Sequence, residues 1–267
     1  MRYRATLAYD GTAYQGFQRQ VDGVPSIQFA VERAVSQVTG QQVTVIGAGR
    51  TDTGVHATGQ VIAFDVDWSY SAYGLFRAVN AALPDDITLQ DLTMTTAEFQ
   101  PRFDACSRVY RYQILQAETR QPLLRNRTWH FSKMLDLEEM QQAAEVLIGK
   151  HDFATFGQAP YGDNTVREVF VSKWSRFEQE IGFILTYEVE ATAFLKHMVR
   201  RMVGVLVEVG RGRITVEQLG DILRSADLAR VKLVAPPQGL TLYKVKYPDE
   251  KYQKNREEIV PCFVDKV

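Results

Sequence analysis

The sequence VTVIGAGRTDTGVHATGQVIAF, residues Val43 to Phe64, places a glycine-rich polar loop between two apolar runs. The runs have the length and β-branched content of strands, so the pattern predicts a strand, a loop and a second strand. Inside the loop, Asp52 follows Arg50 by two residues and precedes His56 by four. A lone Asp in such a loop usually caps or turns the backbone. The neighbouring Arg, His and glycines also suit an ionised, positioned carboxylate, so spacing alone leaves both interpretations open.

Outward from this loop, the first half of the chain alternates strands and helices. Ser26 is a suitable N-cap and Gly40 a suitable end for a helix whose apolar residues recur every three to four positions. The other expected elements are strands at Tyr3–Tyr9, Val43–Ala48, Gly59–Val66 and Ile87–Thr93 and a helix at Ala72–Leu83. The order is therefore β-α-β-β-α-β.

The second half repeats that order. Its expected elements are strands at Arg108–Leu115, Val166–Trp174, Phe183–Glu190 and Leu240–Tyr247, and helices at Leu137–Ile148 and Leu195–Val209. Extra segments interrupt it at 118–134 and at 216–233, the latter expected to be helical. This is the ferredoxin-like order, in which helices cover one face of an antiparallel sheet.

The predicted fold class is therefore α+β, with two ferredoxin-like halves joined into an antiparallel sheet around a central cleft. The expected divisions are an N-terminal half at 1–104, which holds the Asp52 loop, a C-terminal half at 105–248, and a C-terminal tail at 249–267. Near 101–107 the first repeat ends and the second begins, and this segment lacks the composition of a flexible linker.

The composition is that of an ordinary globular protein, with 267 residues and a net charge of −1. Arginine makes up 21 of the 31 basic residues, and its planar fork suits phosphate contacts and stacking on bases. No apolar run approaches the ~20 residues of a membrane helix, and the first residues lack the apolar segment of a secretory signal. Cys106 and Cys262 are in no metal-ligand spacing and the four histidines are scattered, so we expect a cytoplasmic protein without a metal site.

The octet Gly49–His56 resembles the catalytic loop of the A-type tRNA pseudouridine synthases, which commonly read Gly-Arg-Thr-Asp-Ala-Gly-Val-His. The resemblance covers nearly the whole chain. Its other matches are Ala8–Thr12, Gly16–Gln20, Phe76–Pro84, Arg102–Ala105, Asp152-Phe153, Phe156, Phe194–Arg200, Gly239-Leu240 and Tyr243. Four positions depart from the common pattern: Phe17 for Trp, Thr53 for Ala, Gln100 for His and Arg201 for Asn.

The resemblance implies an isomerase that converts uridine to pseudouridine in the anticodon stem-loop of tRNA, on the 3′ side of the arm. It also implies a homodimer that uses no cofactor. Asp52 is then the essential carboxylate, acting as a nucleophile or as the base that triggers glycal formation, and the sequence does not choose between these. Arg50 and Arg200 are candidates for keeping Asp52 charged, since a nearby guanidinium lowers the pKa of an Asp. Tyr110 is implied to stack on the target uracil, although alternating tyrosines in a strand more often pack in a core.

Five further side chains are candidate substrate or RNA contacts. They are Arg19, Arg77, Arg102, Arg108 and His56. Arginines at such positions suit phosphate groups, whose contacts would make tRNA binding weaken steeply with salt.

Two other readings compete with the synthase. Asp52-Thr53-Gly54 spells the aspartic-protease signature, but that chemistry needs two carboxylates sharing a proton, and no second copy occurs in the chain. A homodimer would supply one, yet the adjacent Arg50 favours full ionisation of Asp52. The remaining alternative is an RNA-binding protein without catalysis, although closely spaced aromatic motifs of the RNP type are not evident.

Overall fold

The computed structural model describes residues 1–21, 23–160 and 162–248. It is a mixed α+β protein with ten strands and five α-helices in this described part. Contacts divide it into two compact units, one formed by Met1–Cys106 with the chain from Lys244 onward, and one formed by Ser107–Tyr243. The predicted tail at 249–267 lies outside the described residues.

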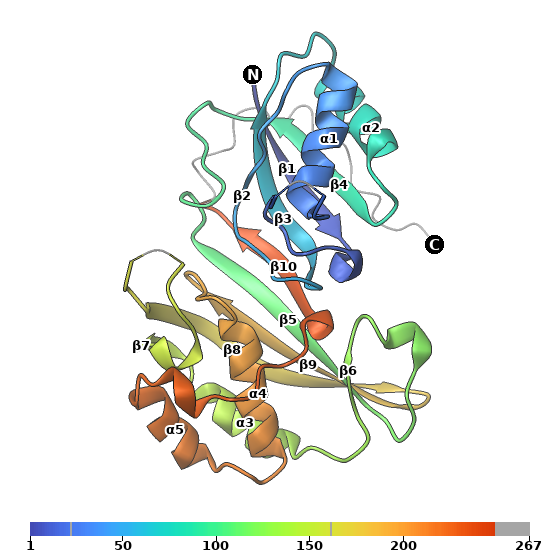
Figure 1. Cartoon of the computed structure of the whole chain (residues 1–267). Helices are drawn as coiled ribbons and strands as arrows, with labels where there is room; N and C mark the ends of the chain where they lie inside the picture. The colour runs from blue at the N-terminus through green and yellow to red at the C-terminus, as the bar shows by residue number, and fades with distance from the viewer. Residues whose placement is uncertain (22, 161, 249–267) are drawn as a thin grey trace. The chain divides into compact units, whose positions relative to one another are not determined.

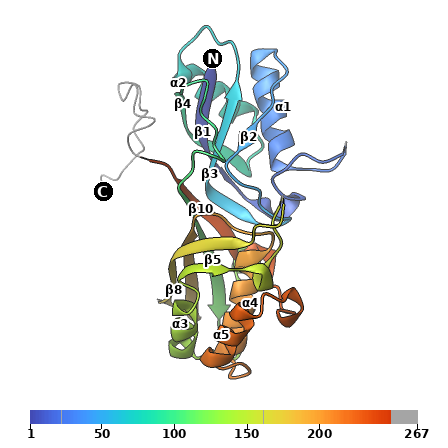
Figure 2. The same cartoon turned by 90° about the vertical axis from the view of Figure 1, so that its left-hand side faces the viewer.

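The first unit has the element order β-α-β-β-α-β that its sequence predicts. Its elements are β1 (Arg2–Tyr9), α1 (Ile27–Thr39), β2 (Ile46–Gly47), β3 (His56–Asp65), α2 (Ala72–Ala82) and β4 (Ile87–Met94). The strands pair antiparallel in the order β4-β1-β3, and β2 pairs with β3. The helices α1 and α2 pack against each other beside these strands (Figures 1 and 2).

Local chemistry explains where these elements begin and end. The Ser26 side chain accepts a hydrogen bond from the Phe29 amide at the start of α1, and Gly40 ends the helix with a left-handed φ of 68°. Alternate residues of β1 are buried, beginning at Tyr3, whose ring stacks on Phe64 with centroids 6.0 Å apart. The core of this unit thus lies on one face of β1, as its two-residue period requires.

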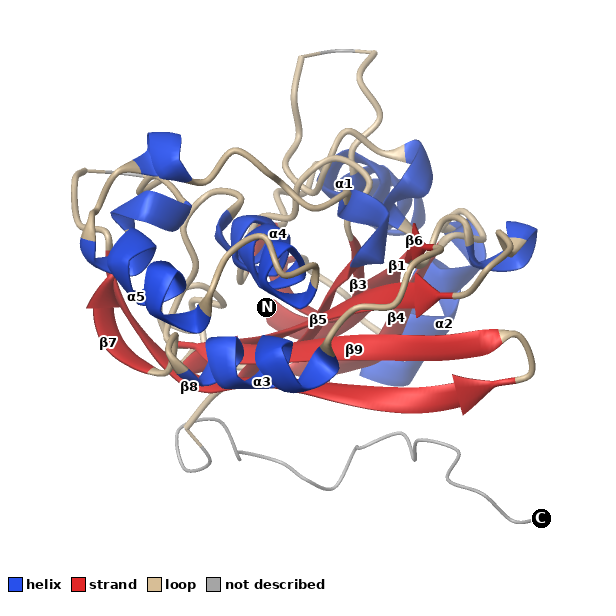
Figure 3. Ribbon diagram, turned by 90° about the horizontal axis from the view of Figure 1, so that it is seen from below, coloured by secondary structure: helices blue, strands red, loops and turns tan. Residues whose placement is uncertain are grey.

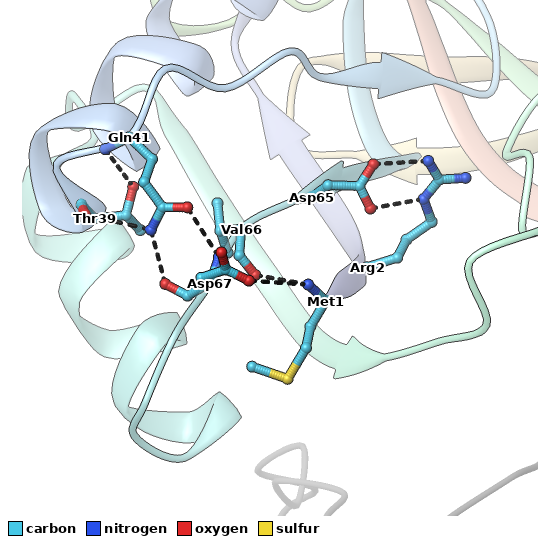
Figure 4. A network of polar contacts seen from close by, with 7 residues as sticks. All are labelled: Met1, Arg2, Thr39, Gln41, Asp65, Val66 and Asp67. Atoms are coloured by element: carbon cyan, nitrogen blue, oxygen red, sulfur yellow. Dashed lines mark hydrogen bonds and ion pairs between the residues drawn. The ribbon is translucent and has the colours of Figure 1, made fainter.

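The N-terminus is tied into the first unit by a polar network (Figure 4). The Arg2 guanidinium donates to both carboxylate oxygens of Asp65, at 3.0 and 2.7 Å, and thereby holds the pKa of Asp65 below its usual range. The Met1 amine donates to the Val66 carbonyl at 3.0 Å, and Gln41 exchanges two hydrogen bonds with the Asp67 main chain. These contacts fix the ends of β1 and β3, the strand that follows the Asp52 loop.

The second unit contains a four-stranded antiparallel run, β5-β9-β8-β7. Its elements are β5 (Ser107–Gln116), β6 (Trp129–Phe131), α3 (Leu137–Glu145), β7 (Gly149–Asp152), β8 (Val166–Gln179), β9 (Gly182–Ala191), α4 (Met198–Gly210), α5 (Val216–Arg224) and β10 (Leu240–Lys246). The last three residues of β10 belong to the first unit. The helix α3 packs on α4, α5 and β8 (Figure 3).

Several element boundaries differ from those expected. The helix expected from Leu195 begins at Met198, because His197 adopts a left-handed φ of 62° that an L-residue rarely holds inside a helix. The strand expected at 43–48 is reduced to Ile46–Gly47, and β6 and β7 are not anticipated by the sequence. Within 216–233 only α5 is α-helical, with a 3-10 turn at Leu228–Arg230.

Across the described residues, no helix has the length and apolar character needed to cross a bilayer.

Candidate active site

The loop that carries Asp52 connects β2 to β3, and the residue before Asp52, Thr51, anchors it to β1. Thr51 is buried and its hydroxyl lies 2.8 Å from the hydroxyl of Tyr9, at the end of β1. Asp52 itself is half-buried, whereas Arg50 is exposed. A buried residue directly before the carboxylate fixes where the Asp52 side chain leaves the main chain.

Main-chain hydrogen bonds join this loop to the segment 14–17. The Phe17 amide donates to the Thr51 carbonyl at 3.1 Å, and the Gly54 amide donates to the Tyr14 carbonyl at 3.3 Å. Within the loop, the Val55 amide donates to the Asp52 carbonyl at 3.1 Å, closing a tight turn in which Gly54 takes a φ of 75°. Asp52 thus lies between two anchored residues, which is the pre-organisation that a catalytic carboxylate needs.

Glycines allow the two segments to approach this closely. A Cβ atom on Gly16, which has a φ of 91°, would lie 2.7 Å from the Thr51 carbonyl oxygen. A Cβ atom on Gly11 would overlap the Val55 carbonyl oxygen. Glycine at these two positions therefore serves close contact between two parts of the protein itself.

His56 lies behind the loop, 2% exposed. Its Nδ1 atom is 3.1 Å from the Gly11 amide and 3.1 Å from a carboxylate oxygen of Asp10. Without a proton, Nδ1 accepts from the Gly11 amide; with one, in the neutral Nδ1–H tautomer or in the charged ring, it donates to Asp10, so the proton on Nδ1 decides which contact forms. In either form His56 links β3 to the residues that follow β1.

Arg19 takes part in an ion pair that sequence reasoning did not foresee. Its guanidinium lies 3.1 Å from Glu32 on α1, whose side chain is 5% exposed. Glu32 also accepts from Gln28 at 2.9 Å and from the Val45 amide at 3.0 Å. This buried carboxylate connects α1 to the chain just before the Asp52 loop. The only sequence signal for it is an acid at a position of α1 that faces inward.

In the second unit, Tyr110 and Arg200 lie on β5 and α4 respectively. Tyr110 is 8% exposed, and its ring meets the edge of Phe194 with centroids 5.0 Å apart. The Arg200 Nε donates to the Ala235 carbonyl at 2.8 Å. Burial raises the pKa of Tyr112, and the charge of Arg200 opposes part of that rise. Phe194 was not predicted as a site residue, although it opens the matched segment that leads into Arg200.

The remaining predicted RNA contacts are arginines at three separate places. Arg77 is exposed on α2, and Arg102 lies in a turn with its guanidinium 5.7 Å from the ring centroid of Phe103. Arg108 on β5 donates to the Thr192 carbonyl at 2.9 Å. The first unit thus carries Asp52, Arg50, His56, Arg19, Arg77 and Arg102, and the second carries Tyr110, Arg108 and Arg200.

The departures from the family pattern occupy identifiable places. The Thr53 hydroxyl lies 3.4 Å from the Gln15 side-chain oxygen, and Arg201 donates to the Lys196 carbonyl at 3.2 Å. Phe17 is buried, and its ring fills the space that a Cβ atom on Gly47 would need. Gln100 is half-buried in the turn that follows β4. Among the described residues, no three His, Cys, Asp or Glu side chains gather as metal ligands would.

The family model described as tRNA pseudouridine synthase matches residues 5–104 and 143–248 of this chain. This chain belongs to the tRNA pseudouridine synthase family. The matched residues include the Asp52 loop, Tyr9 and the first helical turn of α4 with Arg200. Members of this family are isomerases, so the predicted enzyme class is confirmed.

Curated relatives cover nearly the full length of the chain. The tRNA pseudouridine synthase A of Neisseria meningitidis is 39% identical over 249 residues, covering 93% of this chain and 92% of that protein. The enzyme of the same name from Shewanella piezotolerans is 37% identical over 270 residues, covering 99% of each. A solved archaeal box H/ACA Nop10–Cbf5 complex is 8% identical, covers 89% of this chain and 60% of that chain, and has a TM-score of 0.35, too low to define a shared fold.

Proposed function

We propose that this synthase isomerises uridine to pseudouridine in the anticodon stem-loop of tRNA, using the Asp52 carboxylate and no cofactor. The observation that carries the proposal is the anchored Asp52 loop within a chain that matches the synthase family along most of its length. We further infer two ferredoxin-like halves, supported in the first unit by the antiparallel order β4-β1-β3 with β2 on β3.

The reaction rearranges one nucleotide and conserves its atoms. The bond from N1 of uracil to C1′ of ribose breaks, the base rotates, and C5 bonds to C1′. C5 then releases its proton, and the freed N1 gains one. Asp52 acts either by bonding to C1′ or by removing a sugar proton to give a glycal. Both routes need an ionised carboxylate held at the sugar, and Arg50 and Arg200 are the proposed cations that favour its charged form.

Tyr110 is the proposed wall against which the detached uracil stacks. The ring is buried and packs edge-on with Phe194, so its plane is fixed before substrate arrives. Stacking of a base on an aromatic ring contributes ~1–3 kcal/mol, which offsets part of the cost of extruding the uridine from its arm. Arg19, Arg77, Arg102, Arg108 and His56 are proposed substrate or RNA contacts, of which Arg19 and Arg77 are exposed.

A homodimer in the cytoplasm completes the proposal. A tRNA is much longer than one subunit, and a second copy would extend the basic surface. The exposed thiol of Cys106, the free cysteine among the described residues, is consistent with a reducing compartment. Sedimentation equilibrium tests the dimer, since a single species at the mass of one chain would contradict it.

The deciding experiment is tritium release from tRNA labelled at uridine C5. Wild type is compared with Asp52→Asn and with a control, Asp85→Asn, which neutralises an exposed acid between α2 and β4. We expect release by wild type and by Asp85→Asn, and none by Asp52→Asn. Release by all three would remove Asp52 from the mechanism. Tight tRNA binding without release by any of them would instead support an RNA-binding protein without catalysis.

A further inference from the structure

A pocket of about 460 Å³ opens on the first unit, and Asp52, Arg50 and His56 are not among the residues that line it. It lies between residues 19–21 and 23–25, the start of α1 and the chain that follows α2. Its walls are mainly apolar and include Val24, Phe29, Leu83 and Pro84. The size is within the range of ~300–1,000 Å³ typical of small-ligand sites.

Phe29 and Arg33 supply the pocket's two recognition groups. Both are on α1, four residues apart, so their side chains follow one another along a single face of the helix. Phe29 is 46% exposed, which is unusual for a large aromatic residue near a helix start. Arg33 is exposed and, within the described residues, makes no ion pair, whereas the nearby Arg19 is paired with Glu32.

The pocket is connected directly to the Asp52 loop. Tyr14 lines it, and the Tyr14 carbonyl accepts from the Gly54 amide at 3.3 Å. The Tyr14 hydroxyl donates to Asp86 at 2.6 Å, so the residue is fixed at both ends. Tyr14 therefore joins the pocket to the loop that carries Asp52 within one unit of the protein.

Two of the segments that resemble the family, 16–20 and 76–84, contribute residues to this pocket. Arg19 and Gln20 come from the segment 16–20, and Leu83 and Pro84 end the segment 76–84. An apolar slot with an exposed aromatic ring suits the faces of a nucleobase, and a neighbouring unpaired guanidinium suits the attached phosphate. An acidic peptide would use the guanidinium, but it would gain less from the aromatic ring.

We propose that this pocket holds one unpaired nucleotide of the tRNA substrate, distinct from the uridine that reacts. The inference rests on the proposed function and adds a second nucleotide site to it. The base stacks on Phe29 between Val24 and Leu83, and Arg33 contacts the phosphate. By holding a second nucleotide, the pocket would orient the arm while the reacting uridine leaves its stack.

The test measures tRNA affinity, its salt dependence and tritium release for four variants. Phe29→Ala should weaken tRNA binding about 5- to 150-fold, the range that one stacked base spans, with little change in kcat. Arg33→Gln should make the slope of log K against log salt shallower by about 0.7 to 0.9, the value for one lost phosphate contact. Arg33→Lys should restore the slope. Gln37→Ala, exposed on α1 and outside the pocket, should match wild type.

A cross-link identifies the occupant. Phe29 is replaced by p-benzoylphenylalanine, the complex with unmodified tRNA is irradiated, and the linked nucleotide is located by reverse transcription. A link to a nucleotide other than the reacting uridine supports the proposal. A link to the reacting uridine overturns the proposal. So does the absence of any link together with unchanged affinity and salt slope in the variants. In both cases tritium release by wild type would still support the proposed function. Absence of both tRNA binding and release by wild type would refute both.

Discussion

Substituting Gly16 by alanine tests whether packing behind the Asp52 loop controls catalysis. Gly16 has a φ of 91°, and a Cβ atom there would lie 2.7 Å from the Thr51 carbonyl oxygen. The left-handed backbone costs an alanine roughly 1–2 kcal/mol. The clash forces the Thr51 carbonyl away and weakens its hydrogen bond from Phe17, which is worth about 1 kcal/mol. Gly16→Ala should therefore destabilise the protein by about 2–3 kcal/mol.

The control separates backbone strain from displacement of the loop. Gly40 also has a left-handed φ, of 68°, but a Cβ atom there meets nothing within 4 Å. Gly40→Ala should cost only the strain of about 1–2 kcal/mol and leave the reaction rate unchanged. Gly16→Ala moves the residue next to Asp52, and a misplacement near 1 Å lowers rates by about 100-fold. We expect a 10- to 100-fold lower kcat with KM nearly unchanged.

Urea denaturation gives the two stabilities, and single-turnover tritium release with saturating enzyme gives the rates. Both variants are assayed at a temperature at which each is fully folded. A Gly16→Ala enzyme as destabilised as expected but as fast as wild type would refute the reasoning. It would show that the position of Asp52 does not depend on the segment 14–17. Equal losses of rate in both variants would point to a general effect of strain.

Three further predictions concern single side chains. Asp65→Asn removes the ion pair with Arg2, in which the Asp65 side chain is 58% and the Arg2 side chain 13% exposed, and should cost about 1 kcal/mol at pH 7. Because Arg2 lowers the pKa of Asp65, this stabilisation is present above the unfolded-state pKa of about 3.9 and is lost as pH falls through the folded-state pKa. The free energies of unfolding of variant and wild type, from urea curves, should therefore converge as the pH is lowered through that range. Glu32→Gln replaces an acceptor of three hydrogen bonds by a group that also donates, and should lower the free energy of unfolding, measured by urea denaturation, by about 2–3 kcal/mol. The control Glu138→Gln, exposed in the first turn of α3, should cost about 0.3–1 kcal/mol through the helix dipole alone. Tyr110→Ala should lower kcat/KM for tRNA about 5- to 150-fold, because it removes the stacking ring. Tyr110→Phe keeps the ring and should stay within about threefold of wild type. Equal losses in both variants would assign the function to the hydroxyl.

Sequence patterns were enough to predict the order of elements in the first unit and the loop that carries Asp52. Hydrophobic periodicity located β1, α1, β3 and α2 because each buries one face, and the spacing of apolar residues records that face directly. Local capping chemistry, as at Ser26 and Gly40, was equally readable because it depends on neighbours along the chain. The octet identified the family because its residues are contiguous.

Only the tertiary structure decided what lies against that loop and which charges are already paired. The contact of Gly16 with Thr51, the burial of His56 and the pairing of Arg19 with Glu32 all join residues from different elements. The pocket around Phe29 likewise combines residues from 14 to 84, which no local pattern connects. Periodicity reports whether a side chain faces inward, but its partner is set by how the elements pack in space, and that information is distributed over the whole chain.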